Sequence, residues 1–268
     1  MKFIHYPKKS LGQNFLIDKN IINKIINIGD INNNKIILEI GAGYGHLTKR
    51  ILEMKPKKLF AVEKDKNLFF KLNEDLKGVK NIKIINKDIL RIIKNNKFGE
   101  KLIVFGNLPY NVSTKILSCL ILLKKWPPWY DELILMFQKE VADRIIAKKK
   151  SKDFSRLSVL CNWRLDINKH FDVSKYSFFP IPKISSTVLS FKVKKDNKFP
   201  LKNPKNLEIV TRVLFSNRRK MINKNFNKLF SNPSRVSNEL NLNLTLRPEE
   251  ISCEMFYKIA FKYENLLK

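Results

Sequence analysis

Residues 35–45 read KIILEIGAGYG, an apolar and β-branched run that leads straight into a turn containing three glycines. Such a run is typical of a strand with both faces buried. Glycine has no Cβ, so it adopts positive φ easily and lets the main chain approach a ligand closely. The stretch therefore predicts a strand, a tight turn and the first residues of a helix.

The spacing of the glycines narrows the range of ligands that the turn could bind. A dinucleotide fingerprint needs G-x-G-x-x-G, whereas Gly41, Gly43 and Gly45 are spaced G-x-G-x-G. Glu63 ends the next predicted strand, about 20 residues on, where an acid can accept hydrogen bonds from ribose hydroxyls. Asp88 follows the third strand, where it can read an adenine edge. Each feature alone also suits a turn or a helix cap, but the ordered set favours a nucleoside without a diphosphate, such as S-adenosylmethionine.

Strands and helices alternate through the first two thirds of the chain. This alternation predicts an α/β fold, a Rossmann-like and mostly parallel sheet covered on both faces. A helix over 18–28, with Asp18 as its N-cap, precedes the first strand. Residues 156–165 and 187–194 are two further strand candidates, of which 187–194 alternates as an antiparallel edge requires. The predicted strands are 35–40, 58–63, 82–86, 102–105 and 132–137, and the predicted helices are 45–54, 65–76, 113–124 and 138–148.

A change in composition predicts two domains. Residues 194–205, KKDNKFPLKNPK, are polar and basic with two prolines, which is typical of a linker. The segments that follow lack strand-like alternation. We therefore predict a catalytic domain over 1–195 and a small all-helical C-terminal domain over 205–268. Its expected helices are 206–216, 218–230, 233–240 and 248–267.

The charge of the chain points to a polyanionic partner. Its 268 residues include 53 Lys and Arg against 24 Asp and Glu, a formal net charge of +29. Such a field favours nucleic acid or an anionic membrane. An AT-rich genome would also enrich Lys, Asn and Ile, so part of the lysine content has another explanation.

Other classes find little support in the sequence. No apolar run approaches the roughly 18 residues of a membrane-spanning helix, and the N-terminus lacks the features of a signal peptide. The three cysteines are far apart and the three histidines are scattered, so neither a disulfide framework nor a metal site is expected. We expect a soluble, cytoplasmic protein without structural metal.

A second motif, VFGNLPYNVST over residues 104–114, raises a question of its own. Pro109 fixes its own φ and pushes Leu108 towards an extended conformation, so the turn is stiff. Stiffness is useful if Asn107 and Tyr110 hold something in a set position. Taken alone, the motif also reads as a strand followed by a helix cap.

Nine motifs follow one another in order along the chain: GQNFL (12–16), EIGAGYGHLT (39–48), VEKD (62–65), NKDIL (86–90), NLPYNVST (107–114), MFQKEVADRI (136–145), RLSVL (156–160), FFPIPKISS (178–186) and SNRRKMI (216–222). Together they resemble one family over nearly the whole chain, the ribosomal RNA small-subunit adenine dimethyltransferases of the KsgA/Dim1 type. The late FFPIPKISS and SNRRKMI segments make the resemblance more specific than the nucleoside motifs alone. Ser155 stands where the family usually has glycine, which would strain the backbone if that position needs positive φ.

The resemblance implies a class I methyltransferase that uses S-adenosylmethionine. Its substrate would be two adjacent adenosines in a hairpin loop near the 3′ end of small-subunit (16S) rRNA, in a precursor of the 30S subunit. Each would become N6,N6-dimethyladenosine, and the enzyme would act as a monomer. The implied cofactor contacts are Asn14, Leu16, Gly41, Glu63, Asp88 and Asn107, and the implied catalytic residues are Asn107, Leu108, Pro109, Tyr110 and Phe178.

The chemistry explains why NLPY suits amino-group methylation. Adenine N6 is a poor nucleophile because its lone pair is delocalised into the ring. The Asn107 side-chain oxygen and the Leu108 carbonyl can each accept one N6 hydrogen, which favours a pyramidal nitrogen. Tyr110 and Phe178 can sandwich the base once it leaves its stack. Lysines in predicted loops or flexible segments (8, 9, 148–150 and 152) and the basic run 218–220 at the start of a predicted helix suit phosphate contacts as a set.

Three alternatives stay open at this point. A large-subunit (23S) rRNA adenine methyltransferase of the kind that confers macrolide resistance shares the fold, although the late motifs favour the small-subunit family. A ribosome-assembly or transcription factor that lost turnover is a non-enzymatic alternative, against which the intact NLPY, Glu63 and Asp88 argue. A DNA adenine methyltransferase is disfavoured because its motif commonly ends in Pro-Pro-Tyr.

Overall fold

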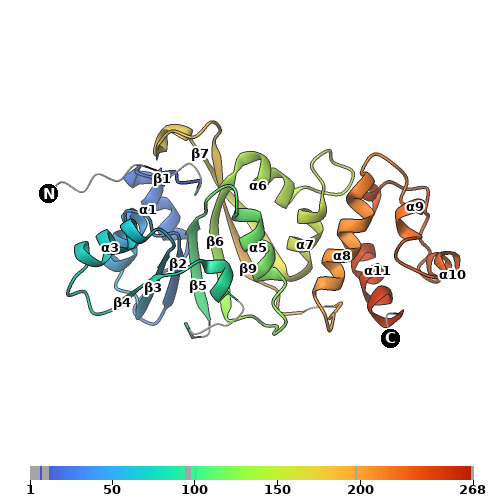
Figure 1. The fold of residues 1–268 in the computed structure, drawn as a ribbon, viewed down its shortest axis with the longest axis horizontal. Coiled ribbons are helices and arrows are strands. Elements are labelled where there is room, and N and C mark those ends of the chain that lie inside the picture. Colours follow the sequence, from blue (N-terminus) through green and yellow to red (C-terminus); the bar gives the residue numbers. More distant parts are fainter. Residues whose placement is uncertain (1–6, 8–11, 94–97, 100, 197, 267–268) are drawn as a thin grey trace. The chain divides into compact units, whose positions relative to one another are not determined.

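The computed structural model describes residues 7, 12–93, 98–99, 101–196 and 198–266. The chain divides into two compact units (Figure 1). One holds the chain up to Leu120 together with Pro127–Ala142 and Ile167–Val193. The other holds Ile121–Trp126, Asp143–Asp166 and the chain from Lys194 onwards. The predicted domain limits at 195 and 205 stay a prediction.

The first unit is built on a seven-stranded sheet of order β4-β3-β2-β5-β6-β9-β7 (Figure 1). The first five strands in this order are parallel, and β9 is antiparallel to β6. The predicted mostly parallel sheet with an antiparallel strand near one edge is therefore confirmed. The strands are β2 (Ile36–Ile40), β3 (Lys58–Glu63), β4 (Ile82–Asn86), β5 (Leu102–Asn107), β6 (Tyr130–Gln138), β7 (Leu165–Val173) and β9 (Ser186–Val193).

Helices follow the strands where the sequence predicts them. Three of these helices begin at an aspartate whose carboxylate accepts main-chain N–H groups of the first turn: Asp18, Asp65 and Asp88. The helices are α1 (Lys19–Ile28), α2 (His46–Glu53), α3 (Lys66–Asp75), α4 (Ile89–Ile92), α5 (Ser113–Ile121) and α6 (Lys139–Ile146).

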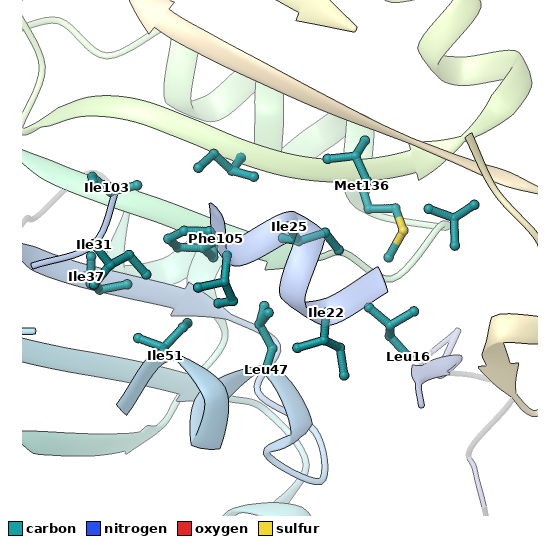
Figure 2. Close-up of a cluster of buried hydrophobic side chains, with 14 of the residues drawn as sticks. Leu16, Ile22, Ile25, Ile31, Ile37, Leu47, Ile51, Ile103, Phe105 and Met136 are labelled. Atoms are coloured by element: carbon teal, nitrogen blue, oxygen red, sulfur yellow. The ribbon is translucent and has the colours of Figure 1, made fainter. Parts of the chain in front are cut away.

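One hydrophobic core cluster of the described residues lies between the sheet and helices α1 and α2. Figure 2 shows Ile22 and Ile25 of α1 beside Phe105 and Met136 of the sheet. Because apolar residues recur along one face of α1 at helical spacing, that face is buried while the other stays polar. This packing holds the carboxyl ends of β2 and β5 in fixed positions.

The predicted strand at 156–165 is wrong, because residues Arg156–Arg164 form helix α7. Most of this helix is buried, including Val159, Leu160 and Trp163. A helix that is apolar on several sides lacks the one-sided stripe that distinguishes it from a buried strand. Ser155, before the helix, has φ −152°, an extended conformation, so serine carries no strain there.

Three strands are absent from the sequence prediction. β7 reads LDINKHFDV, and most of its residues are polar and exposed, so it lacks the apolar run by which the other strands were predicted. β1 (Phe15–Leu16) and β8 (Phe178–Phe179) are two residues each and pair with one another as a separate antiparallel ribbon. Strands this short carry no detectable periodicity.

The second unit is helical in the part of the chain that the structure describes. Residues 218–230 are predicted as one helix, but only α9 (Asn223–Phe226) forms there. Asparagines at 223, 225 and 227 are poor helix formers, which is consistent with the shortness of α9. The other helices are α8 (Lys205–Leu214), α10 (Pro233–Glu239) and α11 (Cys253–Leu266). Within the described ranges, no helix combines the length and apolar character needed to cross a membrane.

Candidate active site

The strand order reverses between β2 and β5, and the glycine turn follows β2 at this switch point. Gly41 has φ +78°, and a Cβ built there would have the Asn107 carbonyl oxygen, 3.8 Å away, as its nearest neighbour. A Cβ at Gly43 would instead come within 2.9 Å of the Phe15 ring. The main chain at Gly41 is thus accessible beside Asn107, whereas the Phe15 ring occupies the space next to Gly43.

Glu63, at the end of β3, is held by main-chain donors on both carboxylate oxygens. The Gly43 N–H donates to Oε2 and the Asp65 N–H donates to Oε1, each at 2.8 Å. A carboxylate has about four acceptor positions, so Glu63 keeps acceptor capacity for a ligand hydroxyl. Burial raises the pKa of Glu63, and the hydrogen bonds from Asp65 and Gly43 oppose that rise.

Asp88 follows β4 and caps helix α4, accepting the Leu90 N–H at 3.0 Å. Its other oxygen lies 2.9 Å from the Lys64 ammonium. Burial works to raise the pKa of Asp88, but the bonds from Lys64 and Leu90 outweigh it and the pKa is lowered. Both oxygens of the Asp88 carboxylate thus contact protein groups, and Asp88 lines the same pocket as Glu63.

Three side chains hold the segment Gly12–Leu16, here called the N-terminal strap, against the first unit. The Asn107 side-chain amide donates to the Asn14 carbonyl oxygen at 2.9 Å. The His46 Nδ1–H donates to the Leu16 carbonyl oxygen at 2.8 Å, and the Gln13 amide donates to Asp65 at 3.4 Å. Because its nitrogen is used on the strap, Asn107 has its side-chain oxygen left for a substrate hydrogen.

Tyr110, at the end of the NLPY turn, is tied to the antiparallel strand β9. Its hydroxyl lies 2.7 Å from the Ser186 hydroxyl. Burial raises the pKa of Tyr110, so the phenol stays neutral. Sequence reasoning did not single out Ser186, which the structure shows to fix the tip of the ring.

One pocket brings together most of the residues that the sequence singled out. Leu16 lies instead in an adjoining pocket, which Phe15, Gly41, Gly43 and Asn107 also line. Phe178 lines neither pocket: it is 1% exposed and belongs to the hydrophobic core cluster with Leu16. The predicted residues in the first pocket are Asn14, Gly41, Glu63, Asp88, Asn107, Leu108, Pro109 and Tyr110.

A buried acid beneath the glycine turn was not among the predicted site residues. Glu39, on β2, is 1% exposed and accepts a hydrogen bond from the Thr48 hydroxyl at 2.6 Å. Burial raises its pKa to about 8, with the charge of Glu63 adding to the rise and the Thr48 bonds opposing it. The raised pKa favours the protonated, neutral form of Glu39, which lines the adjoining pocket.

The basic residues of the second unit differ in their contacts. Arg218 donates to the Glu249 carboxylate at 2.9 Å and to the Ser151 and Lys152 carbonyls, so it braces the lysine-rich loop 148–152. Arg219, Lys220 and Lys148–Lys150 are exposed. Arg218 is thus engaged within the protein, while its two neighbours face solvent. Lys8 and Lys9 lie outside the described residues.

The fold and the pocket define the class. A parallel sheet whose switch point carries a glycine turn, strand-end acids and a stiff Asn-Leu-Pro-Tyr turn is that of a class I methyltransferase acting on an amino group. Comparison with known proteins defines the family. The chain belongs to the ribosomal RNA adenine dimethylase family, whose model matches residues 4–263.

Relatives of similar length support this assignment. The chain is 50% identical to the Ribosomal RNA small subunit methyltransferase A of Pelagibacter ubique, covering 97% of each protein. It is 38% identical to the protein of the same name from Wolbachia sp. subsp. Drosophila simulans, covering 99% of this chain and 96% of that protein.

Solved structures agree with the fold. A dimethyladenosine transferase from Plasmodium falciparum superposes with a TM-score of 0.78 at 25% identity, covering 94% of this chain and 98% of that one. The 23S rRNA methyltransferase ErmE superposes with a TM-score of 0.66 at 20% identity, covering 94% and 99%. The second likeness shows only that the fold is shared.

Proposed function

We propose that this protein transfers methyl groups from S-adenosylmethionine to N6 of two adjacent adenosines in a 3′-terminal hairpin loop of 16S rRNA, giving N6,N6-dimethyladenosine. The observation that carries the proposal is the Asn107 amide, fixed by the strap in the same pocket as Glu63 and Asp88. The names of the Pelagibacter and Plasmodium relatives support the substrate.

The residues of the pocket fit S-adenosylmethionine. Gly41 presents open main chain where a Cβ would protrude, and Glu63 presents two oriented oxygens to ribose hydroxyls. Asp88 lies beside Ile89 and Leu90, which suits an adenine ring with polar edges. Asn14 and Leu16, on the strap, would hold the methionine end. When bound, S-adenosylmethionine supplies a sulfonium methyl group as the electrophile.

The chain's own residues position the adenine amino group. Asn107 Oδ1 accepts one N6 hydrogen and the Leu108 carbonyl, which Pro109 holds in place, accepts the other. These two acceptors favour a pyramidal nitrogen with its lone pair directed at the methyl group. No strong base is required before transfer, because the amine becomes acidic only as it is alkylated. The rate enhancement then comes mainly from orientation and electrostatics.

Tyr110 stacks on the target base from the end of the NLPY turn, where Ser186 fixes its hydroxyl. Phe178 was predicted as the second stacking ring. In its buried position it supports Leu16 of the strap from the core, and stacking would require it to leave that core. Its stacking on the target base stays a prediction.

The proposed partner is a precursor of the 30S ribosomal subunit, bound by a monomer in the cytoplasm during subunit biogenesis. The net charge of +29 supports a polyanionic partner. Exposed Arg219 and Lys220 of the second unit are suited to phosphate contacts.

The deciding experiment incubates the protein with labelled S-adenosylmethionine and undermethylated small subunits, then separates the nucleosides of the digested RNA by mass. We expect dimethyladenosine at two adjacent sites. The Asn107→Ala variant should lose nearly all transfer and still bind subunits. Tight subunit binding without transfer by the unaltered protein would instead indicate an assembly factor, and transfer only to large-subunit rRNA would indicate the other substrate.

A further inference from the structure

The two faces of the β1–β8 ribbon have different surroundings. Leu16 lies opposite Phe178 and Phe15 lies opposite Phe179. Residues opposite one another in an antiparallel pair project to the same face. Leu16 and Phe178 both belong to the hydrophobic core cluster, so Phe15 and Phe179 project from the other face. That face carries a ring at the pocket, Phe15, and a ring in solvent, Phe179.

Phe179 is 56% exposed, whereas the neighbouring Phe178 is 1% exposed. Directly opposed residues have Cβ atoms about 5 Å apart. Phe179 is therefore a direct neighbour of Phe15, which lines the pocket. A large apolar side chain exposed next to a pocket costs hydration free energy unless something covers it in use.

Phe179 belongs to a group of exposed apolar residues on or next to the two chain segments of the β1–β8 ribbon, here called the aromatic lip. The Ile17 N–H donates to the Ser177 carbonyl oxygen at 2.9 Å, which joins the two chain segments of the lip. Its further end leads to Ser186, whose hydroxyl contacts Tyr110. Besides Phe179, the lip consists of Ile17, Tyr176, Ile181 and Ile184, with exposed fractions of 47%, 70%, 58% and 39%.

The charges around the lip identify its occupant. The Lys175 ammonium lies 5.3 Å from the centroid of the Tyr176 ring, and Lys183 is exposed between Ile181 and Ile184. Aromatic rings interleaved with cations are the means by which proteins bind single-stranded nucleic acid, since every base has a face to stack and every nucleotide carries a phosphate. Residues 173–186, all of which the structure describes, include no acidic side chain, although the Asp18 carboxylate accepts a hydrogen bond from the Ser177 hydroxyl at 3.1 Å.

We propose that the aromatic lip is a stacking platform for the unpaired loop nucleotides next to the target adenosine, with Phe179 as its principal ring. The proposal rests on the proposed function, because it places the lip's ligand in the same RNA loop. The lip holds the loop while the target base occupies the pocket. Phe179 thereby determines how well the enzyme prefers a loop to a paired stem.

The first test compares substitutions of Phe179 in the methyl-transfer assay with small subunits. We expect Phe179→Ala to raise KM for the subunit by at least about tenfold, the scale of one lost base stack. Phe179→Trp should keep a low KM, while Phe179→Leu, which keeps apolar area but has no ring face, should resemble Ala. The affinity for S-adenosylmethionine should stay unchanged in all three variants, which also verifies folding.

Phe70 provides the matched control. It is 64% exposed, lies on α3 and lines neither pocket. Phe70→Ala should leave KM unchanged. An unchanged KM for Phe179→Ala, or equal effects of the Leu and Trp variants, would overturn the stacking role. A lack of transfer by the unaltered protein would refute the proposed function instead, so the two failures are distinguishable.

The second test identifies the occupant directly. A photoreactive phenylalanine placed at 179 should crosslink, in the complex with undermethylated subunits, to a loop nucleotide adjacent to a target adenosine. The same group placed at 70 should give no crosslink to that loop. Crosslinking of position 179 to a ribosomal protein alone, or to no component of the subunit, would overturn the proposal.

Discussion

At the scale of single residues, two glutamates on neighbouring strands have different roles. Glu63 is fixed by two main-chain donors and keeps free acceptor positions towards the pocket. Glu39 lies one strand away, fully buried, with Thr48 as its hydrogen-bond donor. Sequence reasoning found Glu63 because an acid at a strand end faces the ligand edge of a parallel sheet. It missed Glu39 because an acid inside an apolar strand shows its burial only in three dimensions.

We expect Glu63→Ala to weaken S-adenosylmethionine binding by about tenfold to a hundredfold, the scale of hydrogen bonds to a charged acceptor. The change also leaves the Gly43 and Asp65 N–H groups without this acceptor. Calorimetric titration with S-adenosylmethionine measures the effect. Glu53→Ala, at an exposed acid on α2, is the control, and equal affinities for the two variants would contradict the assigned role.

Glu39 should make stability depend on pH. Its pKa rises from an ordinary 4.5 to about 8 on folding, so the folded state holds a proton that the unfolded state releases. Its contribution is therefore present below pH 4.5 and is lost as the pH rises to about 8. We expect the free energy of unfolding to fall by up to about 1.4 kcal/mol per pH unit in this window. Glu39→Gln should remove that slope in denaturant titrations, and identical pH profiles would refute the assignment.

At the scale of elements, the alternating strands and helices of the first unit were predictable, because each buried strand has a short apolar run and each following helix an amphipathic stripe. Helix α7 was not, because its burial on several sides erases the stripe. The β1–β8 ribbon was not either, since its pairing joins residues far apart in the chain. Consequently the sequence could not show which of the two adjacent phenylalanines faces solvent.

The N-terminal strap supplies a prediction at this scale. His46→Ala removes the hydrogen bond to the Leu16 carbonyl and should loosen the strap. Since a typical hydrogen bond contributes about 1 kcal/mol, we expect S-adenosylmethionine to bind roughly fivefold more weakly in calorimetry. His170→Ala is the matched control, because His170 bonds Ser190 on β9 and lines neither pocket. Equal losses in the two variants would show that the strap bond has no specific effect.

At the scale of the whole molecule, the excess of positive charge predicted a polyanionic partner, but composition could not tell which cations are free to bind it. Arg218 illustrates the limit. Its place in an RRK run suggests phosphate binding, yet its guanidinium is engaged with Glu249 and two loop carbonyls. Only three-dimensional contacts separate it from Arg219 and Lys220.

These neighbours should therefore respond differently to substitution. Replacing Arg219 and Lys220 with Ala should weaken binding to small subunits and reduce the slope of log affinity against log salt by about 0.7–0.9 for each phosphate that these side chains neutralise. Arg218→Ala should mainly lower the melting temperature, since it unties loop 148–152. Binding measured over a salt series, beside thermal unfolding, checks both. An unchanged salt slope for the double variant would remove these two residues from the interface.

The hydrogen bond between Asn107 and the strap has a consequence for the timing of catalysis. Dimethylation requires two methyl transfers to each adenosine, each from a fresh cofactor molecule. The strap lines the pocket that the cofactor would leave, and the same strap holds the amide that would grip the adenine. If the strap opens for exchange, Asn107 is released and so is its hold on the half-modified base. The enzyme would then work distributively, and free monomethyl RNA would accumulate early in the reaction.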